Sequence, residues 1–203
     1  VVEISTSIGD NVHRIFQTLN STGRRLSQAD LLRNHFFMLL PAEGEAAYEK
    51  LWAPMERTLD DTVDTFLWVD LVSRGGGRES TARDRVYLRW QQDLEPIEND
   101  ESQVLDELGG LTKRAGDYRL IVNPQMAPTG ALRQRLKRLE EWQTSVHHPI
   151  LLRVLTLHRE GILDQASVVE CVDIIESFLV RRLLVNYPTN NLNRIFVTTV
   201  GQV

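Results

Sequence analysis

The residue types with chemical potential in this sequence are five histidines, one cysteine and several groups of charged side chains. His147 and His148 are adjacent, and no cysteine or carboxylate stands at metal-ligand spacing beside them. Pro149 follows directly, and because proline is favoured in the first turn of a helix, these residues predict a helix start. Cys171 lies in an apolar segment, where a thiol behaves as a small hydrophobic group. We therefore expect neither a metal centre nor a catalytic cysteine.

A glycine run and an aspartate cluster are two further candidates for ligand binding. The run at 75–77 lacks the Lys-Ser or Lys-Thr pair of a phosphate-binding loop and follows no predicted strand, so it predicts a hinge or a disordered loop. Asp60, Asp61, Asp64 and Asp70 offer the oxygen ligands of a divalent cation site. The better explanation of the first three is their position at a predicted helix start, where the helix macrodipole favours negative charge.

Arginine supplies 20 of the 23 basic residues. This bias suits phosphate or carboxylate recognition, because the guanidinium is a planar group with five donors, but it also fits the codon usage of a GC-rich genome. Our candidates for contacts with DNA phosphates form one compact basic set, Arg133, Arg135, Lys137 and Arg138. A second set comprises Arg74, Arg78, Arg83, Arg85 and Arg89. Carboxylates interrupt or follow both sets, so the alternative for each is an ordinary solvated helix face.

The segment from Phe16 to Asn34 carries more polar side chains at a turn than local structure requires. It reads F-Q-T-L-N-S-T-G-R-R-L-S-Q-A-D-L-L-R-N. Gly23 predicts a tight turn, since glycine adopts positive φ without a steric penalty. Ser27 and Asp30 have the spacing of a capping box, which predicts the start of the next helix.

The pattern F-x-x-L-N-x-x-G-x-x-L-S-x-x-D-L-L-R-N resembles the signature segment of the GmrSD-type restriction endonuclease N-terminal domain family. Residues 178–196, which contain F-L-V-R-R-L-L and P-T-N-N-L-N-R-I-F, resemble the late helical segment of the same family. Proteins of this family restrict modified or foreign DNA. The family architecture is a ParB-like nucleotide-binding fold followed by a helical region and often by an HNH nuclease domain.

The resemblance implies that Asn20, Gly23, Asp30, Arg33 and Asn34 line or brace a nucleotide pocket. The family's Asp-Gly-Gln-Gln-Arg motif and its HNH histidine pattern have no counterpart in these 203 residues. The resemblance therefore implies a central piece of a longer protein. A nucleoside triphosphate and Mg²⁺ would belong to that parent protein, and this piece would hold no cofactor of its own.

Helical periodicity dominates the elements that must position these residues. The pattern predicts an all-α single domain of about nine helices over residues 1–203, with a possible subdomain seam at 74–80. Ser167 to about Asn186 has the strongest apolar stripe, which predicts a helix buried on most of its circumference. A short strand is predicted within residues 1–8. Because a strand needs a partner, this segment is either disordered or the remnant of an upstream ParB-like domain.

Composition sets outer limits on function. The net charge of −5 excludes a globally basic nucleic-acid binder, although a local basic patch remains compatible with it. No apolar run is long enough to span a bilayer, and no leader pattern opens the chain, so no membrane association is expected. A single cysteine fits a reducing compartment, which predicts a cytoplasmic location.

The predicted function is a helical scaffold that couples a ParB-like nucleotide-binding module to an HNH nuclease in a GmrSD-like, type IV restriction protein. We expect this region to be non-catalytic by itself, while the parent would be a nucleotide-dependent DNA endonuclease. Its expected partners are DNA, reached through the parent, and the two flanking domains. The alternative is a non-enzymatic helical adaptor whose arginine-rich faces bind a protein partner. A third reading is a parent that has lost its catalytic ends and keeps only the scaffold.

Overall fold

The computed structural model describes residues 26–78, 81–186, 188 and 191–202. Its helices are α2 (Gln28–Met38), α3 (Gly44–Ala47), α4 (Ala53–Leu59), α5 (Val63–Ser73), α6 (Val86–Leu94), α7 (Glu101–Val122), α8 (Ala131–Glu140), α9 (His148–Arg159), α10 (Gln165–Leu184) and α11 (Leu192–Val200). Short 3-10 turns occur at Asp60–Thr62, Arg83–Arg85, Glu95–Ile97 and Pro124–Met126. No β-strand occurs in this part of the chain, so the all-α prediction is confirmed. The predicted strand within residues 1–8 lies outside the described residues, as do Asn20 and Gly23.

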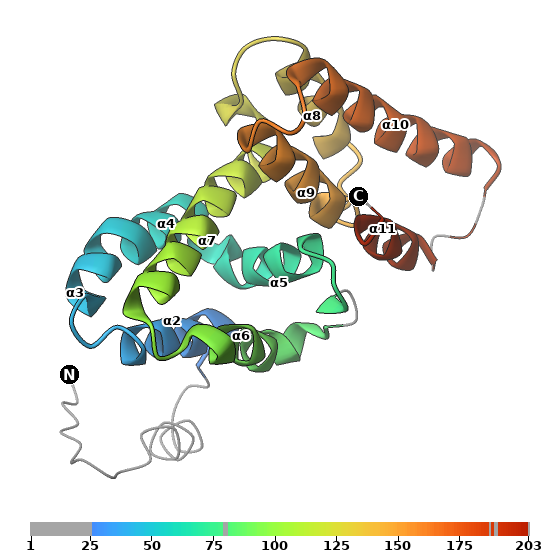
Figure 1. Cartoon of the computed structure of the whole chain (residues 1–203). Helices are drawn as coiled ribbons and strands as arrows, with labels where there is room; N and C mark the ends of the chain where they lie inside the picture. Colours follow the sequence, from blue (N-terminus) through green and yellow to red (C-terminus); the bar gives the residue numbers. More distant parts are fainter. Residues whose placement is uncertain (1–25, 79–80, 187, 189–190, 203) are drawn as a thin grey trace.

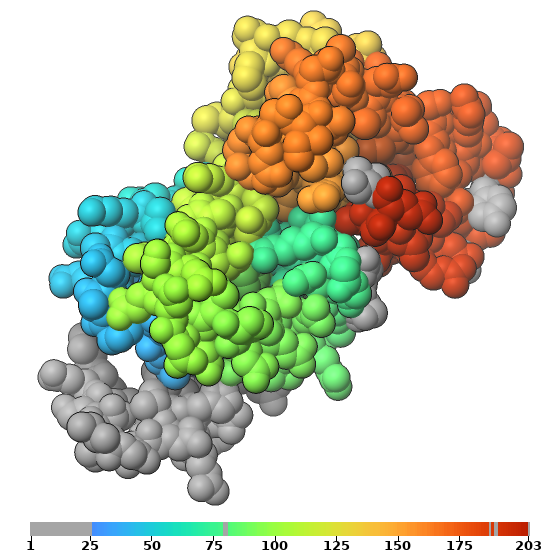
Figure 2. All heavy atoms as spheres, in the orientation of Figure 1, coloured from blue at the N-terminus to red at the C-terminus, as the bar shows by residue number. Residues whose placement is uncertain are grey.

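The long helix α7 runs through the middle of the molecule and joins two groups of helices (Figure 1). Helices α2 to α6 form one group, in which α4 and α5 contact α7, and α8 to α11 form the other, in which α8 and α9 contact it. Helix α5 packs against α9 and α11 as well as α7, so it bridges the two groups. In the space-filling view the two groups form a continuous body, and one cluster of buried residues runs from Ala29 to Val197 (Figure 2).

The start of α2 confirms the predicted capping box. Ser27 is the N-cap, its hydroxyl accepts a hydrogen bond from the Asp30 backbone N–H, and the Asp30 carboxylate accepts one from the Ser27 N–H. A third bond comes from outside the helix, because the Ala29 N–H donates to Asp64 Oδ1 over 2.7 Å. These bonds satisfy N–H groups that have no partner within the helix and join α2 to the start of α5.

The sequence pattern predicts one helix from Ala42 to about Arg57, kinked or shortened at Pro54. In the structure this segment is divided into three pieces, because α3 continues into a π-helical turn, Tyr48–Trp52, and then into α4. Pro54 occupies the first turn of α4, where its missing N–H costs least. The change of helix type therefore falls just before this proline, and the helix count differs slightly from about nine.

The core of the first group is aromatic. Phe36 of α2 is fully buried, with its ring centroid 6.1 Å from Trp52 and 6.0 Å from Trp90. Phe66 of α5 lies 5.5 Å from the ring of Tyr118 on α7. Such rings bury large apolar areas, so these contacts fix how α2, α5, α6 and α7 pack together.

Four charged side chains form a closed ring between α5 and α7. Asp70 contacts Arg74 and Arg114 at 2.9 and 2.5 Å, and Glu107 contacts the same two arginines at 2.6 and 3.1 Å. Two carboxylates balance two guanidinium groups, so the ring is neutral. Burial works to lower the pKa of Arg114, but Asp70 and Glu107 outweigh it and raise that pKa above its ordinary value.

The turn after α5 lies in the range 74–80, where the sequence predicts a possible subdomain seam. Gly75, Gly76 and Gly77 all have positive φ (64°, 66° and 86°), which explains the three glycines. Arg74 before the turn pairs with α7 through Glu107, and Arg78 after it pairs with Asp93 of α6 at 2.7 Å. Ion pairs on both sides thus tie this turn to neighbouring helices.

Two local expectations fail. The spacing of Thr81 and Asp84 predicts a second capping box, but Asp84 lies in the 3-10 turn Arg83–Arg85, and neither this turn nor α6 has a side-chain cap. The second failure concerns α10, where Val168, Val172, Ile175 and Leu179 are buried as the apolar stripe predicts. Its next member, Leu183, is 67% exposed. The helix buried on nearly all sides is instead α5, where every residue from Phe66 to Ser73 is buried.

Candidate functional site

The signature residues that the structure describes hold α2 in place. Arg33 Nη2 lies 2.7 Å from Asp30 Oδ1, and its Nη1 lies 2.9 Å from Glu56 Oε1 on α4. Because Asp30 also closes the capping box with Ser27, one connected set of polar contacts joins α2 to α4. Asn34, the third described candidate, is half-buried on the same helix.

The hollow beside this set is acidic. Its volume is about 310 Å³, and its acidic lining residues are Asp30, Glu56, Asp60, Asp61 and Asp64. The positive charge of Arg33 is already balanced by two of these carboxylates. The hollow is therefore negatively charged, and it would repel a bare phosphate group, which is also negative.

The predicted DNA-phosphate face lies on α8, and half of it is paired within the protein. Arg135 Nε bonds Asp173 Oδ1 on α10 over 2.6 Å. Arg138 pairs with the same aspartate at 3.2 Å and also with Glu176. Arg133 donates to the Ala127 carbonyl oxygen, so its charge is not balanced by a carboxylate, and Lys137 is half-buried. The positive charge available to a phosphate is thus concentrated on Arg133 and Lys137.

The second basic set is dispersed in the same way. Arg74, Arg78 and Arg89 pair with carboxylates, and the Arg83 guanidinium lies over the Trp68 ring at 4.3 Å. Arg85 is exposed and lines an open hollow together with Arg89 and Asp84. These arginines therefore act mainly on their own helices rather than as one continuous basic surface.

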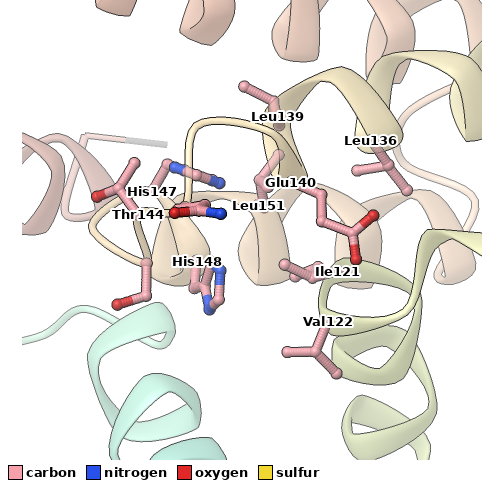
Figure 3. A pocket seen from close by; sticks show the side chains of 11 residues that line it. Ile121, Val122, Leu136, Leu139, Glu140, Thr144, His147, His148 and Leu151 are labelled. Carbon is pink, nitrogen blue, oxygen red and sulfur yellow. The ribbon is translucent and has the colours of Figure 1, made fainter.

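A pocket where α7, α8 and α9 meet contains the two adjacent histidines (Figure 3). Its volume is about 290 Å³, and it is lined by Ile121, Val122, Leu136, Leu139, Glu140, Gln143, Thr144, Ser145, His147, His148 and Leu151. In Figure 3 the histidines lie on one side, and the apolar side chains of α7 and α8 lie on the other. As predicted, His147 and His148 begin a helix, because His147 is the N-cap of α9 and Pro149 stands in its first turn.

Burial makes both histidines neutral at physiological pH. His147 is 2% exposed, and burial, helped by the neighbouring His148, lowers its pKa to about 3. Burial and the charge of Arg83 lower the pKa of His148 to about 4. Burial also raises the pKa of Tyr118 to about 12, against the opposing effect of Arg83. The Tyr118 hydroxyl lies 3.4 Å from His148 Nδ1, so two uncharged groups share this hydrogen bond.

The chemistry of this pocket follows from that neutrality. His147 Nδ1 is buried and has no hydrogen-bond partner among the described residues. Uncharged imidazoles above apolar walls suit a neutral molecule that can form hydrogen bonds, whereas a phosphate would require a positive charge. Among the described residues, Tyr118 supplies the one hydroxyl that is hydrogen-bonded to either histidine, and no serine, threonine or cysteine side chain bonds them.

The sequence identified the histidine pair and the helix start, but it did not link Tyr118 or Arg83 to these histidines. Tyr118 lies 30 residues before His148, and nothing in the local pattern links them. The depth of His147 depends on Phe196 of α11, whose ring centroid lies 6.3 Å away. Only a signal for contacts between distant segments could have found this pocket.

Among the described residues, no group of three or more histidine, cysteine, aspartate or glutamate side chains is arranged to hold a metal ion. None of the described helices combines the length and hydropathy that a bilayer span requires. Comparison of the chain with protein-family models, curated proteins and solved structures finds no significant match.

Proposed function

We propose that this chain is the helical scaffold of a GmrSD-like restriction protein, which couples a nucleotide-binding module to a nuclease. In this function the signature residues act as a brace. Asp30 and Arg33 position α2 against α4, and Asp64 positions it against α5. Asn20 and Gly23 would precede this brace at the nucleotide module, and Asn34 would support it from α2. DNA, the nucleotide and Mg²⁺ would act through the parent protein, in the cytoplasm.

The single observation that supports this proposal is the contact set of Ser27, Asp30 and Arg33. All three belong to the pattern that resembles the family signature, and all three contact one another or a neighbouring helix. A segment that acts as a scaffold is expected to contain residues that fix one helix relative to others. The three residues meet that expectation through specific polar contacts.

The proposal is tested first in the protein encoded by the complete reading frame. That protein should contain an Asp-Gly-Gln-Gln-Arg motif before Val1 and should hydrolyse a nucleoside triphosphate in the presence of Mg²⁺. Arg33→Gln should reduce the hydrolysis rate at least about tenfold, because loss of the brace displaces α2. Arg57→Gln, an exposed arginine beside Glu56, is the matched control and should leave the rate unchanged. Equal rates for the two variants would refute the brace.

A second test uses the 203-residue chain and duplex DNA. With Mg²⁺ and nucleotide present, we expect no cleavage, and clean cleavage would overturn the scaffold function. If α8 contacts DNA phosphates, Arg133→Gln and Lys137→Gln should each weaken binding in a gel-shift titration, and the effect should shrink as salt rises. Arg138→Gln should weaken it less, because Arg138 already pairs with Asp173 and Glu176.

The second candidate function is the non-enzymatic adaptor that binds a protein partner. Its supporting observation is the exposed apolar surface of α10, where Leu183 and Leu184 are more than half exposed. Contiguous apolar surface of this kind is typical of protein interaction sites. Salt-sensitive binding to modified duplex DNA would favour the scaffold, and a stable acidic protein partner would favour the adaptor.

A further inference from the structure

The C-terminal half of α10 presents an apolar face that the described residues leave partly uncovered. The buried stripe of the helix continues from Leu179, which is 5% exposed, to Leu183, and a parallel row contains Val180 and Leu184. Residues four apart lie on the same side of a helix, so these two neighbouring rows form one surface. Leu183 is 67% and Leu184 78% exposed. We call Leu179, Val180, Leu183 and Leu184 the α10 face; the C-terminal end of α10 lies at the right-hand edge of the molecule in Figures 1 and 2.

A groove runs alongside the α10 face. Its volume is about 500 Å³, and it is lined by Trp142, Thr144, Val146, Leu179, Arg182, Leu183, Asn186, Leu192 and Asn193. Helices α10 and α11 meet at the ring contact between Phe178 and Phe196, 5.7 Å apart, and residues beyond this contact form the groove. Apolar side chains thus supply most of a concave surface, which suits the ridge of a helix.

The charged side chains around the groove are mainly basic, with Glu141 beside the lining residue Trp142 as an exposed acidic exception. Arg182 lines it, and Arg181 and Arg194, each next to a lining residue, are exposed. Neither Arg181 nor Arg194 makes an ion pair with another residue in the described ranges. Of the described residues that line the groove, none is acidic. The carboxylates of Asp173 and Glu176, earlier on α10, are already paired with α8.

We propose that the α10 face and its groove bind an acidic amphipathic helix of a partner protein. The apolar side of such a helix would cover Leu183 and Leu184, and its carboxylates would meet Arg181, Arg182 and Arg194. A second copy of this chain fits less well, since a two-fold contact would bring the same arginines against each other. A bilayer presents a flat surface, whereas this site is concave. The site would specify which class of partner the adaptor binds. This inference therefore rests on the proposed adaptor function.

The test measures binding of a synthetic helix to the 203-residue chain by fluorescence anisotropy. The probe is a fluorescein-labelled peptide of about 18 residues with leucines at i, i+3, i+4 and i+7 and glutamates on the remaining face. A second peptide keeps the leucines and replaces every glutamate with lysine. We expect the glutamate peptide to bind, the lysine peptide not to bind, and added salt to weaken the complex.

Three variants locate the binding. Leu183→Ser together with Leu184→Ser should weaken the glutamate peptide at least about tenfold, because the apolar anchor is lost. Arg181→Gln together with Arg194→Gln should weaken it about threefold or more and reduce the salt dependence. Ile174→Ser is the matched control, since Ile174 is a 60% exposed apolar residue on α10 outside the groove, and its binding should match that of the unchanged chain. Thermal unfolding of each variant checks that it remains folded.

Several outcomes would overturn the proposal. Failure of the glutamate peptide to bind would refute the proposed site, although the adaptor could still act through another surface. Salt-sensitive DNA binding without a protein partner would instead refute the adaptor function. Equal binding of both peptides would contradict the charge complementarity. A dimer in sedimentation that Leu183→Ser dissociates would identify a second copy as the occupant. Binding to phosphatidylglycerol vesicles in place of the peptide would identify a lipid surface.

Discussion

Arg114 Nε lies 2.5 Å from Asp70 Oδ1, and the Asp70 carboxylate is completely buried between α5 and α7. A buried carboxylate is tolerated only where charge partners and hydrogen bonds replace water. Arg74 and Arg114 supply both, and Glu107 closes the ring on the solvent side. This ring joins a helix of the first group to the long helix that leads to the second.

Asp70→Asn should lower the free energy of unfolding by about 3 kcal/mol, because two buried guanidinium groups lose a charge partner. Urea denaturation followed by circular dichroism measures this loss. Asp173→Asn is the matched control, since Asp173 also contacts two arginines, Arg135 and Arg138, but 40% of its side chain is exposed. Its loss should stay below about 1 kcal/mol. Equal losses would show that burial does not determine the effect.

The two pocket histidines should make the protein less stable in acid. Their pKa values in the folded state, about 3 for His147 and about 4 for His148, lie below the ordinary 6.5, so the unfolded chain binds more protons between these values. The free energy of unfolding should fall as pH decreases from 6.5, on the order of 2 kcal/mol for His147 at pH 5. His147→Gln should flatten this dependence. A flat profile in the unchanged chain would contradict the burial of the pair.

Two glycine substitutions should have opposite signs. A Cβ at Gly77 or at Gly109 would meet no atom within 4 Å, so sterics are matched. Gly77 has φ of +86°, where a side chain is strained, and Gly77→Ala should destabilise the protein by about 1 kcal/mol. Gly109 lies within α7, and Gly109→Ala should stabilise it by about 0.5–1 kcal/mol. A lower melting temperature for Gly77→Ala and a higher one for Gly109→Ala would confirm both predictions. Shifts of the two variants in the same direction would contradict one of them.

Phe36→Ala should be among the most damaging single changes in α2. Its ring is fully buried between Trp52 and Trp90, so truncation leaves a cavity and should cost about 3–5 kcal/mol of unfolding free energy. Phe37→Ala is the neighbouring control, because Phe37 is only half-buried and contacts Tyr48 and Trp52 by its edge. Chemical denaturation of both variants should rank Phe37→Ala as the milder change. The reverse order would place the aromatic core elsewhere.

Much of the fold could be predicted because its signals are local. The Ser27–Asp30 capping box, the interruption at Pro54 and the buried stripe of α10 depend on residues within a few positions of one another. The Asp70–Arg114 pair spans 44 residues, and periodicity contains no signal for it. Leu183 has the spacing of a buried residue, but periodicity cannot say whether another helix is present to cover it.

The candidate sites show the same limit. The residues of the α8 basic face were identified from their types, but two of the four are paired with carboxylates of α10 about 38 residues away. The function of Asp30, Arg33 and Asn34 in a nucleotide pocket stays a prediction, and Asn20 and Gly23 lie outside the described residues. The histidine pocket was visible as a helix start, whereas its neutrality depends on three helices that enclose it.

The uninterrupted length of α7 has a consequence for how the protein can change over time. Its 22 residues rise about 33 Å, and each residue turns the helix by about 100°. Insertion of a single residue would therefore swing α8 to α11 around the axis of α7 as well as push them outward. Relatives of this chain should vary in length at their surface turns, while the helix that corresponds to α7 keeps the same number of residues.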